Sequence, residues 1–270
     1  MELYGTLETL LETAAPAEKI GGFKTFYAAY QNGSVSRDPA RACRVFEHPS
    51  YEGFCTIADP KEVPRRNHLK SPHGQTLLLH AIAHIEYSAI DLALDAVYRF
   101  RDEGEEFERD WLEVADDEVR HFEMIEALLR ELGSGYGAYP VHDALFEASM
   151  RTLSLSERMA VVPRYLEANG LDATPQILRK LEPHKKDPMV AKIIAALHVI
   201  LDEEVDHVRK GDKWFARSCR KEQIPQSSYF EIIERHYPGS FPRKIDINCE
   251  ARRRAGFAQG ELEKISSNRC

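Results

Sequence analysis

The sequence contains two Glu-x-x-His motifs, Glu118 to His121 and Glu204 to His207. On an α-helix, residues three apart lie on one face, so each motif points a carboxylate and an imidazole in the same direction. Apolar residues share that face in both segments, which predicts that both pairs face a core. These apolar residues are Trp111, Val114, Ile125 and Leu129 in the first segment and Val190, Ile194, Leu197, Leu201 and Val208 in the second. Buried carboxylates and histidines are usually paired or bind metal, because an isolated buried charge is costly.

A short motif is weak evidence by itself, so the placement of both motifs on apolar faces carries the argument. A dinuclear carboxylate site in a helical bundle takes one further glutamate from each of two other helices. This arrangement predicts one glutamate before the first motif and one between the two. Glu86 fits the first position, because it interrupts an apolar stripe. Glu167 fits the second, although the periodicity around it is poorer and an ordinary surface role remains the alternative.

Four glutamates and two neutral imidazoles would balance and ligate two divalent metal ions. Mixed carboxylate and imidazole ligands suit iron or manganese, although the ligand types alone do not exclude zinc. We therefore expect two divalent ions as the cofactor, with iron favoured and manganese or a mixed pair as alternatives. Six protein ligands leave open coordination positions for water, O₂ or substrate, and two ions about 3.5–4 Å apart can act jointly.

Other polar residues near the motifs are candidates for supporting roles. Asp117 and Glu203 each precede a predicted ligand and could orient the histidine of the other motif; a surface role is the alternative. Tyr87, like Tyr165, could donate electrons or protons, although packing is the more common role of such tyrosines. His80 and His84 are four apart, but both point away from Glu86 on a helix. We interpret this pair as structural or as supporting the ligands.

The apolar periodicity and the turn residues predict a chain made of helices. The arm from 37 to 72 is rich in Pro, Gly and Ser, which predicts irregular structure lying against the body. Gly21-Gly22 is expected to break the chain, Asn169-Gly170 to end a helix, and Pro163 to kink that helix. Helices are predicted at about 2–13, 73–100, 105–132, 142–152, 155–169, 174–182, 189–219, 227–235 and 249–265.

Composition and charge limit the partners. The net charge of -8 argues against broad binding to a phosphate backbone, with a local basic patch as the alternative. We interpret Arg65-Arg66 and Arg252-Arg253-Arg254 as solvated surface; the alternatives are an anionic partner for the first and an RNA or phosphate contact for the second. Five scattered cysteines without a Cys-x-x-Cys pair indicate reduced thiols in a cytoplasmic protein. We see no N-terminal signal and no apolar run that would span a bilayer, so no membrane association is expected.

The ligand pattern resembles that of the ferritin-like di-iron carboxylate superfamily, which includes ferritins, rubrerythrins, ribonucleotide reductase small subunits and a tRNA-modifying hydroxylase. More narrowly, His84-Ile85-Glu86 together with Val63-Pro64-Arg65-Arg66 resembles a bacterial ferritin-like family of unknown function, domain-of-unknown-function family 455. The match covers roughly residues 60–220. The resemblance implies an all-α, ferritin-like four-helix bundle with a di-metal centre in its core. Additional N- and C-terminal helices and the Pro-rich arm lie outside that pattern.

On this basis we expect a terminal helix and arm at 1–70, the di-metal bundle at 71–220 and a helical extension at 221–270. The expected function is a non-haem dinuclear iron or manganese oxidoreductase that activates O₂ or peroxide, such as a hydroxylase. Its substrate would be a small molecule or a nucleic acid, and an oxygenase would also need an electron donor. A homodimer is left open. The alternatives are a non-catalytic metal protein used for storage, sensing or structure, and a metal-free helical interaction protein.

Overall fold

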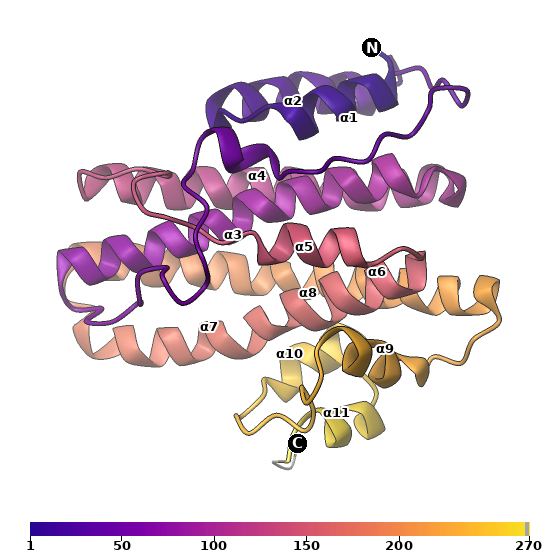
Figure 1. Ribbon diagram of the computed structural model, residues 1–270. Helices are drawn as coiled ribbons and strands as arrows, with labels where there is room; N and C mark the ends of the chain where they lie inside the picture. The colour runs from indigo at the N-terminus through magenta and orange to yellow at the C-terminus, as the bar shows by residue number, and fades with distance from the viewer. Residues whose placement is uncertain (268–269) are drawn as a thin grey trace. The chain divides into compact units, whose positions relative to one another are not determined.

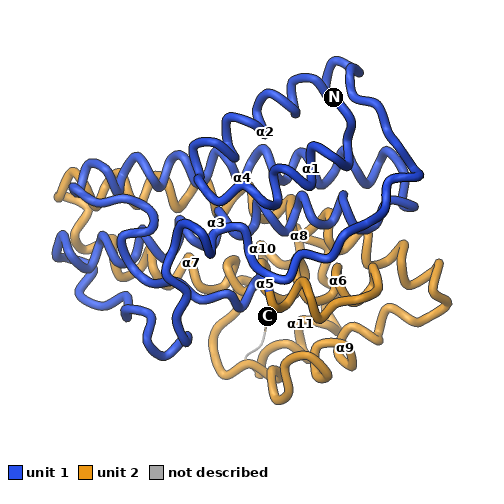
Figure 2. Tube along the Cα trace, turned by 45° about the horizontal axis from the view of Figure 1, so that its top comes forward, with its two compact units in different colours: residues 1–146 blue, residues 147–270 orange. Residues whose placement is uncertain are grey.

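The computed structural model describes residues 1–267 and 270, and these form an all-helical protein. Within them, β-structure is limited to isolated bridges, such as that between Ile57 and Val141. Backbone contacts divide the chain into two compact units, residues 1–146 and 147–270 (Figure 2). The all-α prediction is therefore confirmed. The three-part division at 70 and 220 stays a prediction, because the contacts divide the chain only once.

Unit 1 is built on a hairpin of two long helices, α3 (Pro72–Arg99) and α4 (Glu105–Glu131) (Figure 1). Helix α3 begins where the sequence predicts, because the Ser71 hydroxyl accepts a hydrogen bond from the Gly74 amide at 3.1 Å. The short 3₁₀ turn η2 (Arg101–Glu103) and Gly104, at φ +84°, reverse the chain. The apolar faces of the two helices pack on each other and form the core of this unit.

Helices α1 (Leu3–Glu12) and α2 (Pro16–Gln31) pack on this hairpin, α1 on α3 and α2 on α4. The predicted break at Gly21-Gly22 is wrong, because α2 continues through both glycines. Gly22 instead allows close packing of α1 and α2. A Cβ atom at Gly22 would lie only 3.1 Å from the Leu10 side chain.

The arm between α2 and α3 is irregular, as predicted, apart from the 3₁₀ turn η1 (Ser50–Gly53). A buried polar cluster fixes it to the hairpin. The Lys19 ammonium group donates a hydrogen bond to the Ser50 hydroxyl at 2.5 Å and forms an ion pair with Asp91. Ser50 also hydrogen-bonds to Asp91. The Lys19 side chain is fully buried, so its charge requires this carboxylate.

Unit 2 is organised around its longest helix, α8 (Pro188–Glu222). A second, interrupted helix packs along α8 and consists of α6 (Leu155–Val161), the π-helical segment η3 (Val162–Glu167) and α7 (Ala168–Leu181). The predicted end at Asn169-Gly170 and the predicted start at Thr174-Pro175 are wrong, because α7 runs through both. The disturbance expected from Pro163 is present as η3. Helix α5 (Ala144–Arg151) precedes α6, and the 3₁₀ turn η4 (Glu182–His184) follows α7.

The C-terminal part of unit 2 consists of short helices α9 (Ser228–His236), α10 (Cys249–Arg254) and α11 (Gln259–Ile265). The single helix predicted at 249–265 is therefore wrong. The chain turns at Gly256, which has φ +106°. A side chain there would also collide with the Asp212 carboxylate, since a Cβ atom would lie 2.5 Å from Oδ2.

A disulfide joins Cys249 to Cys270, and the two Cα atoms are 5.7 Å apart. Cys43, Cys55 and Cys219 are free thiols. The expectation that all five cysteines are reduced is thus wrong for one pair. The sequence did not indicate the pairing, because 21 positions separate the two residues and the turn at Gly256 lies between them.

Reducing the Cys249–Cys270 bond is expected to lower the free energy of unfolding by about 3 kcal/mol, because the bond closes a loop of roughly 20 residues in the unfolded chain. Urea unfolding with and without reductant, beside Cys249→Ser, measures this loss. Thiol labelling in denaturant should modify three cysteines before reduction and five after it. Labelling of all five without reductant would contradict the bond.

Helix α3 is long and apolar enough to cross a membrane by length and composition, with a mean hydropathy of 1.3 over its best window. The expectation that no segment meets this test is therefore wrong. However, 78% of that window is buried inside the fold, as in the core helix of a soluble protein. The cytoplasmic location stays a prediction.

Candidate metal centre

The α3–α4 hairpin brings together three of the predicted ligands, Glu86, Glu118 and His121. His121 Nδ1 lies 3.2 Å from Glu86 Oε2 and 3.6 Å from Glu118 Oε2. All three side chains are buried, and Glu118 and His121 have no exposed surface. Each residue offers one ligand atom within 4.8 Å of those of the other two. We call these three residues the hairpin cluster.

The electrostatics of the hairpin cluster favour a cation. Burial, together with the neighbouring Glu118 carboxylate, raises the pKa of Glu86 to about 8. Burial lowers the pKa of His121, but hydrogen bonds and charge interactions with Glu118 and Glu86 outweigh it and raise the pKa to about 12. Without metal, the cluster therefore retains protons at neutral pH. Two carboxylates and one imidazole in an apolar interior fit a divalent ion, which would displace those protons.

Local sequence explains why these polar groups are held in the interior. Glu86 lies on α3 between Ile82 and Ile90, and all three side chains are buried on one face. On α4, Val114 and Ile125 flank the motif in the same way. The free energy of packing these stripes forces the hairpin cluster inward, so the pattern of residues predicted the burial of these three side chains, while their role as metal ligands stays a prediction.

The second motif lies on α8 in unit 2. His207 is fully buried, and its Nδ1 is 4.0 Å from Glu204 Oε1. Glu204 is largely buried, with a side-chain exposure of 13%. Val208 is buried as predicted, while Ile194 and Leu201 are only half-buried. The Glu-x-x-His pair therefore shares one face of α8, as the spacing predicted.

Glu167 is the last residue of the π-helical segment η3, which packs on α8. Pro163 has no amide hydrogen to donate to the preceding turn, which breaks the regular α-helical ladder at this point. Gly211 of α8 lets Pro163 approach closely, because a Cβ atom at Gly211 would lie 2.3 Å from Pro163 Cβ. π-Helical turns inside α-helices are frequent at functional sites. Glu167 itself is half-buried.

The predicted supporting residues have the following surroundings. Asp117 forms an ion pair with Arg120 on its own helix. Glu203 is half-buried on α8. Tyr87 is fully buried, and its hydroxyl donates a hydrogen bond to the Ala14 carbonyl at 3.3 Å. Tyr165 hydrogen-bonds to the Ser240 hydroxyl at 2.8 Å. The roles of Asp117, Glu203 and Tyr87 toward the metal stay predictions.

His80 and His84 fit the structural role that we expected for them. His84 Nδ1 lies 2.9 Å from the Tyr136 hydroxyl and Nε2 lies 2.7 Å from the His142 carbonyl, which suits a neutral ring protonated at Nε2. His80 Nε2 accepts hydrogen bonds from the backbone amides of Gly137 and Tyr139, at 3.0 and 3.3 Å. Both rings therefore tie the loop after α4 to α3.

The neutral state of His80 predicts acid sensitivity. Burial lowers its pKa to about 4 in the folded protein, whereas an unfolded histidine titrates near about 6.5. The unfolded chain thus binds the proton first, and the stability from this group falls as the pH drops from about 6.5 to about 4. We expect a loss on the order of 3 kcal/mol, which corresponds to this difference in pKa.

Urea unfolding of metal-free protein between these pH values measures the slope. His80→Gln should make the slope shallower but not flat, because the substituted side chain does not titrate while burial also lowers the pKa of His84 to about 4. His73→Gln is the control, since His73 lies on the same helix but is exposed. Equal slopes in His80→Gln and the unchanged protein would contradict the assignment.

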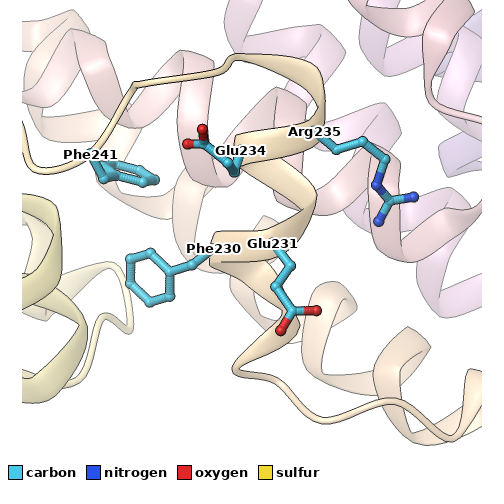
Figure 3. Close-up of a pocket in the computed structure, with 5 residues that line it drawn as sticks. All are labelled: Phe230, Glu231, Glu234, Arg235 and Phe241. Carbon is cyan, nitrogen blue, oxygen red and sulfur yellow. The ribbon is translucent and has the colours of Figure 1, made fainter.

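A surface pocket of about 560 Å³ lies elsewhere, against α9 (Figure 3). Phe230 and Phe241 form one wall, with ring centroids 5.5 Å apart, and the charged side chains belong to the same helix as Phe230. Glu231, Glu234 and Arg235 are these charged residues. None of the predicted ligands lines this pocket.

Sequence reasoning missed several buried arginines in unit 2. Arg252 was expected on a solvated face, but it is buried and pairs with Asp172, so that expectation is wrong. Arg164 is buried in η3 and pairs with Asp212 and Glu261. No local pattern marks these residues, because their partners lie on other helices. The close approach of Pro163 to Gly211 was equally invisible in the sequence.

Comparison with known proteins identifies relatives without a known activity. A family model described as "Protein of unknown function (DUF455)" matches residues 12–263. An uncharacterized protein from Haemophilus influenzae is 40% identical over 218 residues, which cover 77% of this chain and 73% of that protein. No solved structure matches.

Proposed function

The chain belongs to the DUF455 family, and from that premise we propose that it is a non-haem dinuclear metal oxidoreductase, with iron as the favoured metal. The hairpin cluster is the observation that carries this proposal, because two carboxylates and an imidazole are buried together within 4.8 Å. Such a cluster is costly unless a cation or protons balance its charge. In this proposal the metal-bound form of the cluster is the functional state.

The six side chains would serve one centre with two ions. Glu86, Glu118 and His121 would hold one ion, and Glu167, Glu204 and His207 would complete the second. This requires the α3–α4 hairpin and the two long helical runs of unit 2 to pair as a ferritin-like four-helix bundle, which is part of the proposal. The doubled motif supports it, because each half presents a Glu-x-x-His pair on a buried helical face.

When bound, a dinuclear iron or manganese centre supplies one- and two-electron chemistry with O₂ or peroxide, directed at a substrate still to be identified. The chain's own residues perform the tasks that this chemistry requires. The four glutamates and two histidines would bind the ions, and the apolar stripes of α3 and α4 exclude bulk water from the hairpin cluster. His121 and Glu86 hold protons that metal binding would release. A separate electron donor is also part of this proposal.

Metal content and reaction with O₂ test this function. Protein loaded anaerobically with Fe²⁺ and desalted should contain about two irons per chain, as expected for a two-metal site. It should consume O₂ or peroxide faster than metal-free protein. Protein that binds no metal under these conditions, or an iron-loaded form inert to both oxidants, would contradict the proposed oxidoreductase.

A non-catalytic metal protein, used for structure, sensing or storage, is the second candidate. The absence of any exposed surface on Glu118 and His121 favours it, because a structural ion needs no access for substrate. The metal-loading and oxidation experiment above distinguishes the two candidates. A structural site would bind two ions, stabilise the fold and leave O₂ and peroxide unconsumed. Measuring the size of the native protein tests the storage role, because a storage cage requires a very large assembly.

A further inference from the structure

We propose that the three C-terminal helices act as a brace that positions the π-helical segment η3 and thereby presents Glu167 to the second metal ion. This inference rests on the proposed function and names the residues that control one half of its site. All the contacts that carry it lie within unit 2. Helices α9, α10 and α11 each contact the stretch from Arg164 to Asp172, through Tyr229, Arg252 and Glu261.

Helix α10 fixes the residues directly after Glu167. Arg252 donates one hydrogen bond to the Ala168 carbonyl at 3.1 Å and two to the Asp172 carboxylate at 3.1 and 2.7 Å. The Arg252 side chain has only 2% exposure and that of Asp172 has none. A buried arginine that contacts both a backbone carbonyl and a carboxylate one turn later fixes the start of α7, at the end of η3.

Helices α9 and α11 fix the residues before Glu167. The Tyr229 hydroxyl donates a hydrogen bond to the Arg164 carbonyl at 3.0 Å. The Arg164 guanidinium, in turn, pairs with Glu261 of α11 and with Asp212 of α8, each at 2.9 Å. Its charge also lies over the rings of Tyr229 and Phe257, at 4.5 and 4.7 Å.

The hydrogen-bond pattern of the π-helical turn explains why η3 needs these contacts. A π-helical turn does not propagate, because it departs from the regular hydrogen-bond ladder of the α-helix. Contacts from outside must therefore hold its geometry. Tyr229 and Arg252 bond to carbonyl oxygens on the two sides of Glu167, at Arg164 and Ala168. They are positioning residues, since neither is a predicted ligand.

A Co²⁺ titration under anaerobic conditions, followed by absorption and by elemental analysis, tests the brace. In Arg252→Gln the first ion should bind with unchanged affinity, while the second should bind at least about 10-fold more weakly, as for residues that orient metal ligands. A general loss of stability would instead weaken both ions. Arg254→Gln is the matched control, because Arg254 lies on the same helix but is exposed and pairs with the exposed Asp202.

Tyr229→Phe removes a single hydroxyl and keeps the ring, so it tests the brace even if Arg252→Gln does not fold. It should weaken the second ion alone. Tyr237→Phe is the control and should leave both affinities unchanged, because it also removes one hydroxyl but keeps the ring that packs on Tyr165 of η3 at 5.0 Å. Two ions bound with unchanged affinities in both Arg252→Gln and Tyr229→Phe would overturn the brace and leave the proposed function standing. A native protein that binds no Co²⁺ or Fe²⁺ would overturn both proposals.

Discussion

Replacing Glu118 by leucine is expected to abolish metal binding and yet to raise the free energy of unfolding of the metal-free protein by about 1–4 kcal/mol. Glu118 is fully buried, and its negative charge raises the pKa of Glu86 beside it. An apolar side chain of similar size removes the desolvation cost of Glu118 and the repulsion between the two carboxylates. Glu86, 3.2 Å from His121, then ionises more readily and keeps the His121 imidazolium paired. The opposite signs of the two effects distinguish a functional carboxylate from a structural one.

Elemental analysis after Fe²⁺ loading and urea unfolding in the presence of a chelator measure the two effects. Glu123→Leu is the control, because Glu123 lies on the same helix but is exposed and pairs only with exposed Lys24 among the contacts described. It should retain the metal and change stability by no more than about 0.5 kcal/mol. Glu118→Leu with native metal content, or with lower stability in the metal-free state, would contradict the interpretation of the hairpin cluster.

Replacing Asp172 by alanine is expected to lower the free energy of unfolding by about 3–5 kcal/mol, because it leaves buried positive charge without its partner. The Asp172 carboxylate pairs with Arg252, which has 2% side-chain exposure, and with Arg243. It also accepts a hydrogen bond from the Asn248 amide at 2.9 Å. These contacts join α7 to the C-terminal helices, so the loss should be felt across unit 2.

Thermal and urea unfolding measure this loss. Asp202→Ala removes the exposed partner of Arg254 and is expected to change stability by no more than about 0.5 kcal/mol. The double variant Asp172→Ala with Arg252→Leu should recover part of the loss, because it removes the buried charge together with its partner. No difference between Asp172→Ala and Asp202→Ala would refute the importance of this buried cluster.

The sequence predicted the elements whose pattern is local. Helices α3, α4 and α8 follow from apolar periodicity and from end signals such as Ser71 and Gly133. The hairpin cluster follows from the same stripes, because the packing of α3 on α4 brings Glu86 to His121. The continuity of α2 and α7 was not predictable in this way. Their glycines and prolines are typical of helix breaks, but packing against other helices keeps both helices continuous.

Contacts between distant segments explain the remaining differences. Arg252 reads as part of a basic surface run, and only its distance to Asp172 reveals that it is buried. In the sequence, Cys249 and Cys270 have the pattern of isolated thiols. They pair because the chain turns at Gly256 between them. The π-helical segment needs both Pro163 and Gly211, which lie on different helices. In each case, the role of a residue depends on a partner that is distant in the sequence, so the local pattern of residues does not indicate it.

The π-helical segment also sets the angular phase of everything that follows it. Each residue of an α-helix advances about 100° around the axis, so the wider turn at 162–167 decides which side of α7 faces α8. Deleting one residue within this segment would leave too few residues for the wider turn. Unless 162–167 then became α-helical, α7 would rotate by about that angle relative to α6, and Leu171 and Asp172, now buried, would turn away from their present neighbours. This stretch should therefore tolerate substitution at exposed positions far better than any change in its length.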